Sequence, residues 1–137
     1  MNGGTLTYRV LLIEDDERLA QQMREYLGRY GFVVTVVRRG DLAVAAVREH
    51  PPALVMLDLM PPDPDGLEVC RQIRAFSNVP VIVMTPYADA CDQVAVFDAG
   101  ADDYVAKPLA PRVLVARARA LLRRVYRVSP DEADAAT

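Results

Sequence analysis

The apolar residues of this chain gather in short runs that alternate with longer stretches of mixed apolar and polar residues. The short runs are rich in Val, Leu and Ile and end at turn residues, which is typical of buried strands. They cover Tyr8–Ile13, Phe32–Val37, Leu54–Leu57, Val81–Met84 and Tyr104–Ala106. The longer stretches carry apolar residues at helical spacing. They cover Glu17–Tyr30, Asp41–Glu49, Leu67–Ser77, Asp89–Ala99 and Pro111–Val125.

Residues with special backbone preferences mark where several of these helices begin and end. Asp16 is a good N-cap for the first helix, and Pro111 suits the first position of the last helix. Gly31 and Gly100 follow the first and fourth helices, where a left-handed residue commonly ends a helix. The residues predicted to face inward are Leu19, Met23, Tyr26, Leu27 and Tyr30 on the first helix, Val69, Cys70, Ile73 and Phe76 on the third, Val94 and Phe97 on the fourth, and Leu114, Ala118, Leu121 and Val125 on the last.

The strands are apolar along nearly their whole length, so helices must cover both faces of the sheet. Such a sheet is parallel, and right-handed crossovers make it a doubly wound α/β sandwich with five strands and five helices. At 137 residues the chain forms one domain, which we place at residues 8–125. Residues 126–137 are small, acidic and aperiodic, and we interpret them as a tail or the start of an interdomain linker.

Composition excludes several classes of function. The net charge of −3 means that the domain lacks the excess of basic residues that is typical of nucleic-acid binding. His50 is the only histidine, and Cys70 and Cys91 lack the spacing of metal ligands, so a histidine-based triad or metal site is excluded. No apolar run approaches the roughly 18 residues of a membrane span, and the first residues lack a signal-peptide core. We therefore expect a cytoplasmic protein.

Polar residues stand at the ends of four of the predicted strands. Glu14 and Asp15 follow the first strand, Asp58 the third, Thr85 the fourth and Lys107 the fifth. The carboxyl ends of parallel strands open on one edge of a sheet, so these side chains converge if the strands are neighbours. Lys107 is the only lysine beside fifteen arginines, which indicates a site that only a compact ammonium fits.

The residue types at these strand ends point to phosphoryl transfer. Crowded carboxylates without His or Cys select a hard cation, Mg²⁺ or Mn²⁺. The cation and Lys107 would neutralise phosphoryl oxygens, and Thr85 would donate a hydrogen bond to one of them. A carboxylate would be the nucleophile.

The same residues lie in motifs that resemble the receiver domain of two-component response regulators. The motifs are Leu11–Asp16, Asp58–Gly66, Val83–Thr85 and Gly100–Pro108, and the resemblance covers about residues 8–125. The segment Leu114–Arg124 resembles the OmpR/PhoB-type subfamily, whose members carry a winged-helix DNA-binding domain after the receiver. The resemblance implies a CheY-like, flavodoxin-like fold with strand order 2-1-3-4-5. It also implies regulation of transcription through an output domain that this chain does not include.

The resemblance assigns a role to each residue at the strand ends. Asp58 would accept a phosphoryl group from a sensor histidine kinase. Lys107 would pair first with Asp58 and then with that group. Asp15, Asp58 and the backbone carbonyl of Met60 would hold Mg²⁺, while Glu14 would act mainly through a metal-bound water.

The resemblance also implies how the signal leaves the site. Thr85 would turn toward the phosphoryl group and let Tyr104 rotate inward, which would reshape the face made by the fourth helix, fifth strand and fifth helix. The Lys107–Pro108 peptide would be cis. Pro86 departs from the family pattern, in which a small residue usually follows the switch threonine. Its stiff backbone and missing N–H would change the kinetics of switching more than phosphorylation itself.

The same face would form a homodimer, which this chain alters. The residues that match the ionic set of the subfamily are Asp102, Asp103, Arg117 and Arg119. Ala95 and Val113 stand where a further ion pair is usual, so both halves of that pair are apolar. The fifth helix also starts without the usual capping box, and the loss of such a cap lowers the stability by about 1 kcal/mol. We therefore predict a weaker or repacked dimer.

Three other interpretations stay open. A haloacid-dehalogenase-like phosphatase would also use an aspartyl nucleophile and Mg²⁺, but it requires a second acid where this chain has Met60. A flavodoxin-like binder would require a phosphate loop where Glu14 and Asp15 would repel the phosphate. A stand-alone or pseudo-receiver would act through protein contacts without phosphorylation, which the five intact strand-end residues argue against.

Overall fold

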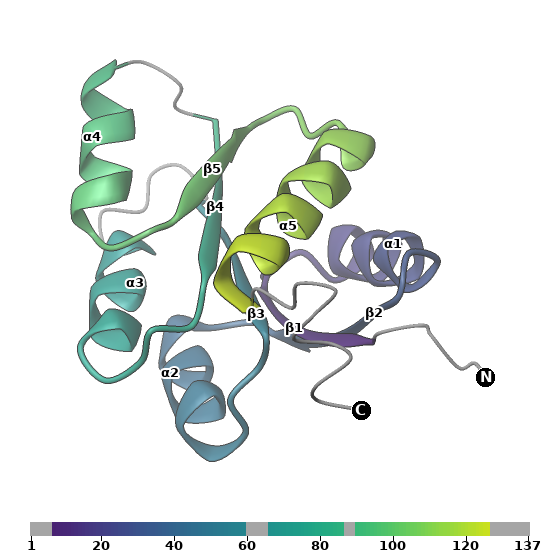
Figure 1. Ribbon diagram of the computed structural model, residues 1–137, viewed down its shortest axis with the longest axis horizontal. Coiled ribbons are helices and arrows are strands. Elements are labelled where there is room, and N and C mark those ends of the chain that lie inside the picture. The colour runs from purple at the N-terminus through teal and green to yellow at the C-terminus, as the bar shows by residue number, and fades with distance from the viewer. Residues whose placement is uncertain (1–6, 60–65, 87–89, 127–137) are drawn as a thin grey trace.

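The computed structural model describes residues 7–59, 66–86 and 90–126, and Figure 1 shows their arrangement. The strands are β1 (Tyr8–Ile13), β2 (Phe32–Val37), β3 (Leu54–Asp58), β4 (Val81–Thr85) and β5 (Asp103–Ala106). The helices are α1 (Glu17–Gly28), α2 (Gly40–Glu49), α3 (Gly66–Arg74), α4 (Ala90–Asp98) and α5 (Pro111–Tyr126). In the described part of the chain, no helix is both long and apolar enough to span a membrane.

The five strands form one sheet in the order β2-β1-β3-β4-β5, and all neighbouring strands are parallel. The ladder pairs Ile13 of β1 with Leu57 of β3, and Asp58 of β3 with Met84 of β4. This register brings the carboxyl ends of β1, β3 and β4 to the same edge. The predicted fold class and strand order are confirmed.

Helices α1 and α5 cover one face of the sheet, and α2, α3 and α4 cover the other (Figure 1). The central strand β3 contributes to both cores. Leu54 and Met56 pack in the core beneath α1 and α5, whereas Val55 and Leu57 pack beneath the other three helices. All four side chains are almost fully buried. This double burial explains why the strand is apolar without alternation.

The predicted helix boundaries at Asp16, Gly31 and Gly100 correspond to real turns. The Asp16 carboxylate accepts hydrogen bonds from the backbone N–H groups of Arg18 at 3.0 Å and Leu19 at 3.1 Å, so it caps α1. Gly31 has a φ of 90° and Gly100 has a φ of 105°, which residues with a β-carbon rarely adopt. These glycines let the chain turn from α1 into β2 and from α4 into β5.

Three of the residues predicted to face inward on the first and fourth helices are exposed instead. Helix α1 ends at Gly28, and Tyr30 lies beyond it with its ring partly exposed against Tyr26. On α4, Val96 is buried in the core, whereas Val94 is 59% exposed and Phe97 is also exposed. Helix α4 has apolar residues on more than one side, so spacing alone could not identify the side that meets the sheet.

The C-terminal end of α5 also differs from its predicted packing. Val125 is exposed rather than inward. The next residue, Tyr126, donates a hydrogen bond from its hydroxyl to the Ala53 carbonyl at 2.7 Å and stacks on Tyr8 with ring centroids 6.2 Å apart. Because Ala53 and Tyr8 lie at the amino ends of β3 and β1, these contacts fix the end of α5 at that edge of the sheet.

Helix α3 ends at Arg74, before its predicted end at Ser77. The Arg74 guanidinium donates hydrogen bonds to the Gly100 carbonyl at 2.8 and 3.0 Å, and to the carbonyls of Ser77 and Val79 at 3.0 and 2.7 Å. It also pairs with Asp102 at 2.9 Å. One side chain thus joins the end of α3 to the start of β4 and to the turn between α4 and β5.

Candidate functional site

The residues predicted at the strand ends are held by backbone ladders. Asp58 and Thr85 are the last residues of β3 and β4, and Glu14 and Lys107 directly follow β1 and β5. The Glu14 N–H donates to the Val37 carbonyl at 3.0 Å, and the Lys107 N–H donates to the Thr85 carbonyl at 2.8 Å. These bonds continue the sheet by one residue, so the side chains start from fixed positions.

Asp58 forms a buried ion pair with Lys107. The Asp58 side chain is 1% exposed and the Lys107 side chain is 19% exposed. The Lys107 ammonium also donates to the Leu59 carbonyl at 3.3 Å. Although Oδ1 of Asp58 faces the ammonium, neither carboxylate oxygen has a well-directed hydrogen bond. Asp58 is thus a carboxylate that is shielded from solvent, and its charge is balanced mainly by Lys107. The Lys107–Pro108 peptide is cis.

Glu14 lies beside Asp58 and is almost fully buried. Its Oε2 accepts the Asp16 N–H at 3.1 Å, and its Oε1 has no hydrogen-bond partner. Burial, followed by the neighbouring Asp58 carboxyl, raises the pKa of the Glu14 carboxyl from 4.5 to about 8. The Asp16 N–H and the charge of Lys107 act in the opposite direction but are weaker. Near neutral pH, Glu14 therefore keeps a proton that it can share with Asp58.

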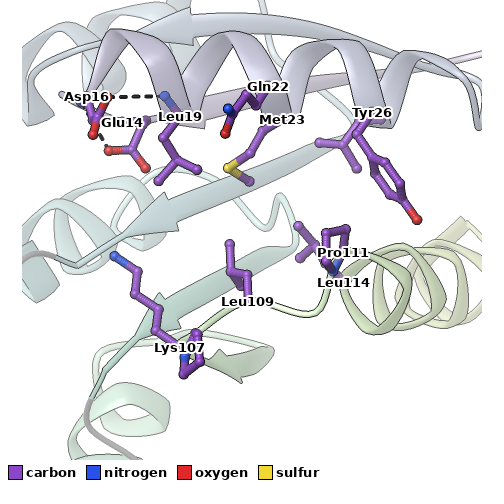
Figure 2. A pocket seen from close by; sticks show the side chains of 12 residues that line it. Glu14, Asp16, Leu19, Gln22, Met23, Tyr26, Lys107, Leu109, Pro111 and Leu114 are labelled. Atoms are coloured by element: carbon purple, nitrogen blue, oxygen red, sulfur yellow. Dashed lines mark hydrogen bonds between the residues drawn. The ribbon is translucent and has the colours of Figure 1, made fainter.

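Two cavities flank this cluster of charges. An apolar cavity of about 530 Å³ lies between α1 and the start of α5, and Figure 2 shows Glu14 and Lys107 at one end of it and Tyr26 and Leu114 at the other. A second cavity of about 460 Å³ lies on the side of α2 and α3. We call it the polar cavity because Asp58 and other charged residues line it together with apolar ones. Asp58 therefore lines the polar cavity, while Lys107, its ion-pair partner, lines the apolar cavity.

A divalent cation fits this cluster by the chemistry of its oxygen atoms. Glu14 Oε1 and both Asp58 oxygens are buried acceptors without a hydrogen-bond donor, and exposed Asp15 lines the same polar cavity as Asp58. Hard cations satisfy such acceptors. Among the described residues, no three acidic, His or Cys side chains are close enough to surround an ion. Further ligands would be required, and the predicted Met60 carbonyl lies outside the described residues.

The two predicted switch residues lie on neighbouring strands. Thr85 is buried at the end of β4, and Tyr104 is partly buried on β5. The Tyr104 ring packs edge-on against Phe97 of α4, with centroids 5.9 Å apart and an interplanar angle of 77°. Pro86 follows Thr85 and is exposed. Tyr104 thus links the strand next to the site with the outer surface of α4.

The four residues predicted for the dimer face have partners within the chain. Asp103 pairs with Arg117 at 3.2 Å. Arg119 lies over the Tyr30 ring, with its guanidinium carbon 5.3 Å from the centroid. Asp102 pairs with Arg74 and also accepts a hydrogen bond from the Val81 N–H at 2.8 Å. The four side chains therefore start from intramolecular contacts.

One residue of the polar cavity was missed in the sequence. Arg38 directly follows β2 and lines the cavity together with Asp58. The rule that located the other site residues, a polar side chain after a strand, also holds for Arg38. It was overlooked because a single arginine among many carries no distinctive signal. Arg74 was missed for a different reason, since its partners are distant in the sequence.

Residues 10–119 match the family described as response regulator receiver domain. The chain belongs to this family. The receiver is 42% identical over 118 residues to the transcriptional regulatory protein BaeR of Escherichia coli O6:H1, covering 86% of this chain and 49% of that protein. It is 47% identical over 120 residues to the DNA-binding response regulator MtrA of Mycolicibacterium smegmatis, covering 88% of this chain and 53% of that protein. The receiver spans about half the length of these OmpR/PhoB-type relatives.

Solved receiver structures share the fold. The BeF3-activated receiver domain of Klebsiella pneumoniae RstA is 34% identical and superimposes with a TM-score of 0.77, covering 84% of this chain and 98% of that chain. A two-component response regulator from Clostridium difficile is 26% identical, with a TM-score of 0.79 and coverage of 86% and 98%. The chain is therefore a receiver domain of a two-component response regulator.

Proposed function

We propose that this receiver accepts a phosphoryl group on Asp58 from a sensor histidine kinase. The observation that supports this most is the buried ion pair between Asp58 and the only lysine of the chain. A carboxylate with one cation partner and no well-directed hydrogen bond has electron pairs available for attack. The polar cavity on the side of α2 and α3 gives the donor access.

In the transfer, one carboxylate oxygen of Asp58 attacks the phosphorus atom. An O–P bond forms, and the bond from phosphorus to the donor breaks, with its electron pair leaving on the donor atom. The Lys107 ammonium is already in place to balance the charge of the bound phosphoryl group. This exchange makes the domain its own phosphotransfer catalyst, although it turns over no separate substrate.

We further propose that Glu14, Asp15 and Asp58 contribute to a Mg²⁺ or Mn²⁺ site together with the Met60 carbonyl. When bound, the cation supplies positive charge that neutralises the phosphoryl oxygens. The unpartnered oxygens of Glu14 and Asp58 support this assignment. Asp15 faces the polar cavity, where a cation and the donor would meet.

The output of the switch is proposed to pass through Thr85 and Tyr104 to α4, β5 and α5. The edge contact between Tyr104 and Phe97 supports this route, because any rotation of Tyr104 changes a surface packed on α4. MtrA is named a DNA-binding response regulator and BaeR a transcriptional regulatory protein, and this chain covers about half the length of each. We therefore propose residues 8–125 as the receiver of a transcription regulator, with 126–137 leading toward a winged-helix domain. The cytoplasmic location stays a prediction.

The decisive experiment is phosphorylation by acetyl phosphate and Mg²⁺, followed by intact mass measurement. The wild-type domain should gain one labile phosphate, which Asp58→Asn should not gain. Asp41→Asn is the matched control, because Asp41 lines the same cavity and lies outside the cluster. Absence of an adduct would instead favour a pseudo-receiver, and steady phosphate release from many substrates would favour a phosphatase.

A further inference from the structure

The polar cavity beside Asp58 is rich in negative charge. Its described lining includes the acidic residues Asp15, Asp41, Asp58 and Glu68, whereas Arg38 is the only basic residue in that lining. The Lys107 ammonium, which balances Asp58, lines the opposite, apolar cavity (Figure 2). An anionic phosphodonor that enters from the polar side therefore meets mostly carboxylates, which repel it.

Two of these acids already have arginine partners. Asp41 binds Arg39 through two hydrogen bonds at 2.8 and 3.0 Å. Glu68 pairs with Arg71 at 3.2 Å along α3. Neither Arg39 nor Arg71 lines the cavity. Their guanidinium groups are occupied at its rim, so among the described lining residues the cation that can meet an entering anion is Arg38.

The ion pair that holds Arg38 can be broken at little cost in free energy. Its guanidinium donates to Glu17 Oε1 at 3.0 Å, and its second terminal nitrogen is 3.5 Å from the Asp15 carbonyl oxygen. The side chains of Arg38 and Glu17 are 59% and 77% exposed, and exposed ion pairs contribute little to stability. A guanidinium presents donors in a planar fork that matches phosphoryl oxygens. Arg38 can therefore leave Glu17 for a phosphoryl group at small cost.

We propose that Arg38 binds the phosphoryl oxygens of the incoming phosphodonor and holds them toward Asp58. This role rests on the proposed function of Asp58 as the phosphoacceptor. The recognised chemistry is an anionic phosphoryl group, whether a small acyl phosphate or a phosphohistidine carries it. Arg38 exchanges one anionic partner for another and gains or loses no proton. Its position directly after β2 gives every one of the five strands a charged or polar residue at the reactive edge.

The test is the rate of Asp58 phosphorylation as a function of acetyl phosphate concentration, with Mg²⁺ at saturation and intact mass as the readout. Arg38→Gln should raise the half-saturating donor concentration about fivefold and leave the rate at saturation unchanged. Arg38→Lys should recover part of this loss because it keeps the charge without the fork. Added salt should slow the wild type more than Arg38→Gln at low donor concentration, since it screens the attraction.

Two matched variants separate this role from a structural one. Arg124→Gln makes the same change in net charge at an exposed position of α5, which covers the other face of the sheet, and should leave the donor dependence unchanged. Glu17→Gln releases Arg38 and should lower the half-saturating concentration. If Arg38 served only to hold Glu17, then Glu17→Gln and Arg38→Gln would shift the kinetics in the same direction, and the proposal would be wrong.

A second donor tests what Arg38 recognises. Phosphoimidazole carries the phosphoryl group on nitrogen, as a phosphohistidine does, and its half-saturating concentration should rise in Arg38→Gln as that of acetyl phosphate does. A loss confined to one donor would contradict recognition of the phosphoryl group. If the wild type gains phosphate and Arg38→Gln matches Arg124→Gln, only the role of Arg38 fails. If the wild type gains phosphate from neither donor, the proposed function of Asp58 fails as well.

Discussion

The carboxyl groups of Glu14 and Asp58 share one small buried space with a single ammonium from Lys107. Burial and the neighbouring Asp58 carboxyl raise the pKa of Glu14 to about 8, so the cluster holds a proton near neutral pH. A cation bound by the Glu14 and Asp58 carboxyl groups would displace this proton, because a carboxyl group must lose its proton to become a metal ligand. A receiver with a cation at this cluster would therefore differ from the metal-free receiver in protonation as well as in ligands.

The raised pKa of Glu14 predicts how the stability of the metal-free domain depends on pH. Between about 4.5 and 8 the folded state keeps a proton that the unfolded chain releases. The free energy of unfolding should therefore fall as the pH rises through this window. Urea unfolding in the presence of a chelator, repeated across this range, would measure the slope.

Glu14→Gln should have a flatter pH dependence than the wild type and should be the more stable of the two at the upper end of the window. Glu25→Gln is a suitable control, since Glu25 is an exposed acid on α1 that bonds only to Gln21. Parallel slopes for Glu14→Gln and the wild type would contradict the assignment of this proton to Glu14.

The position of the candidate residues at one edge of the sheet could be predicted because parallel strands end at one edge. That rule locates Glu14, Asp58, Thr85 and Lys107 from the sequence alone. It did not assign Arg38, whose side chain resembles the other arginines in the sequence. The ion pair of Asp58 and Lys107 was predicted from the resemblance to receiver domains and is confirmed. Spacing alone could not have given it, because only the folded sheet brings the two segments together.

At the scale of elements, the helices differ in how strongly they are attached. Helix α5 has five buried residues along its length, whereas the described part of α4 buries Val96. The starts and ends marked by Asp16, Gly31 and Gly100 were predictable from local chemistry alone. The inward side of α4 was not, because Val94, Val96 and Phe97 leave its pattern ambiguous. The most weakly patterned helix is also the one next to the proposed switch.

The Arg74 cluster should be important for the stability of the half of the domain that contains α3, β4 and α4. Arg74→Met should lower the free energy of unfolding by about 3 kcal/mol, because it removes the guanidinium donor from the part-buried carbonyls of Val79 and Gly100 and the cation partner from Asp102. Arg71→Met should lower it by less than about 0.5 kcal/mol, since Arg71 forms only an exposed pair with Glu68. Urea unfolding of the two variants side by side measures the difference, and equal losses would show that the cluster contributes little.

At the scale of the whole molecule, the face of α4, β5 and α5 carries the residues predicted for association. Val94, Phe97 and Val113 are exposed and apolar, while Asp102 and Asp103 pair within the chain. A dimer formed there must exchange internal ion pairs for intermolecular ones or rely on apolar contact. Both routes favour a weak dimer.

We therefore expect the domain with beryllofluoride and Mg²⁺ to form a weak dimer whose affinity changes little with salt. Sedimentation velocity over a range of protein and salt concentrations would measure it. Val113→Glu should weaken this dimer, because it places a charge in the apolar contact, whereas Val33→Glu, an exposed change on β2, should not. A tight dimer that dissociates in high salt would show that ion pairs dominate and that the apolar residues are incidental.

The hydrogen bond from Tyr126 to Ala53 makes α5 a strut between the two ends of the domain. Its sixteen residues span about 24 Å. One end adjoins the loop that carries Lys107, and the other is tied to the amino ends of β1 and β3. A domain joined beyond Tyr126 would hang from the edge opposite the reacting carboxylate, out of its direct reach. Phosphorylation would then act on that domain through a change in how two receivers associate, rather than through direct contact with the phosphoryl group.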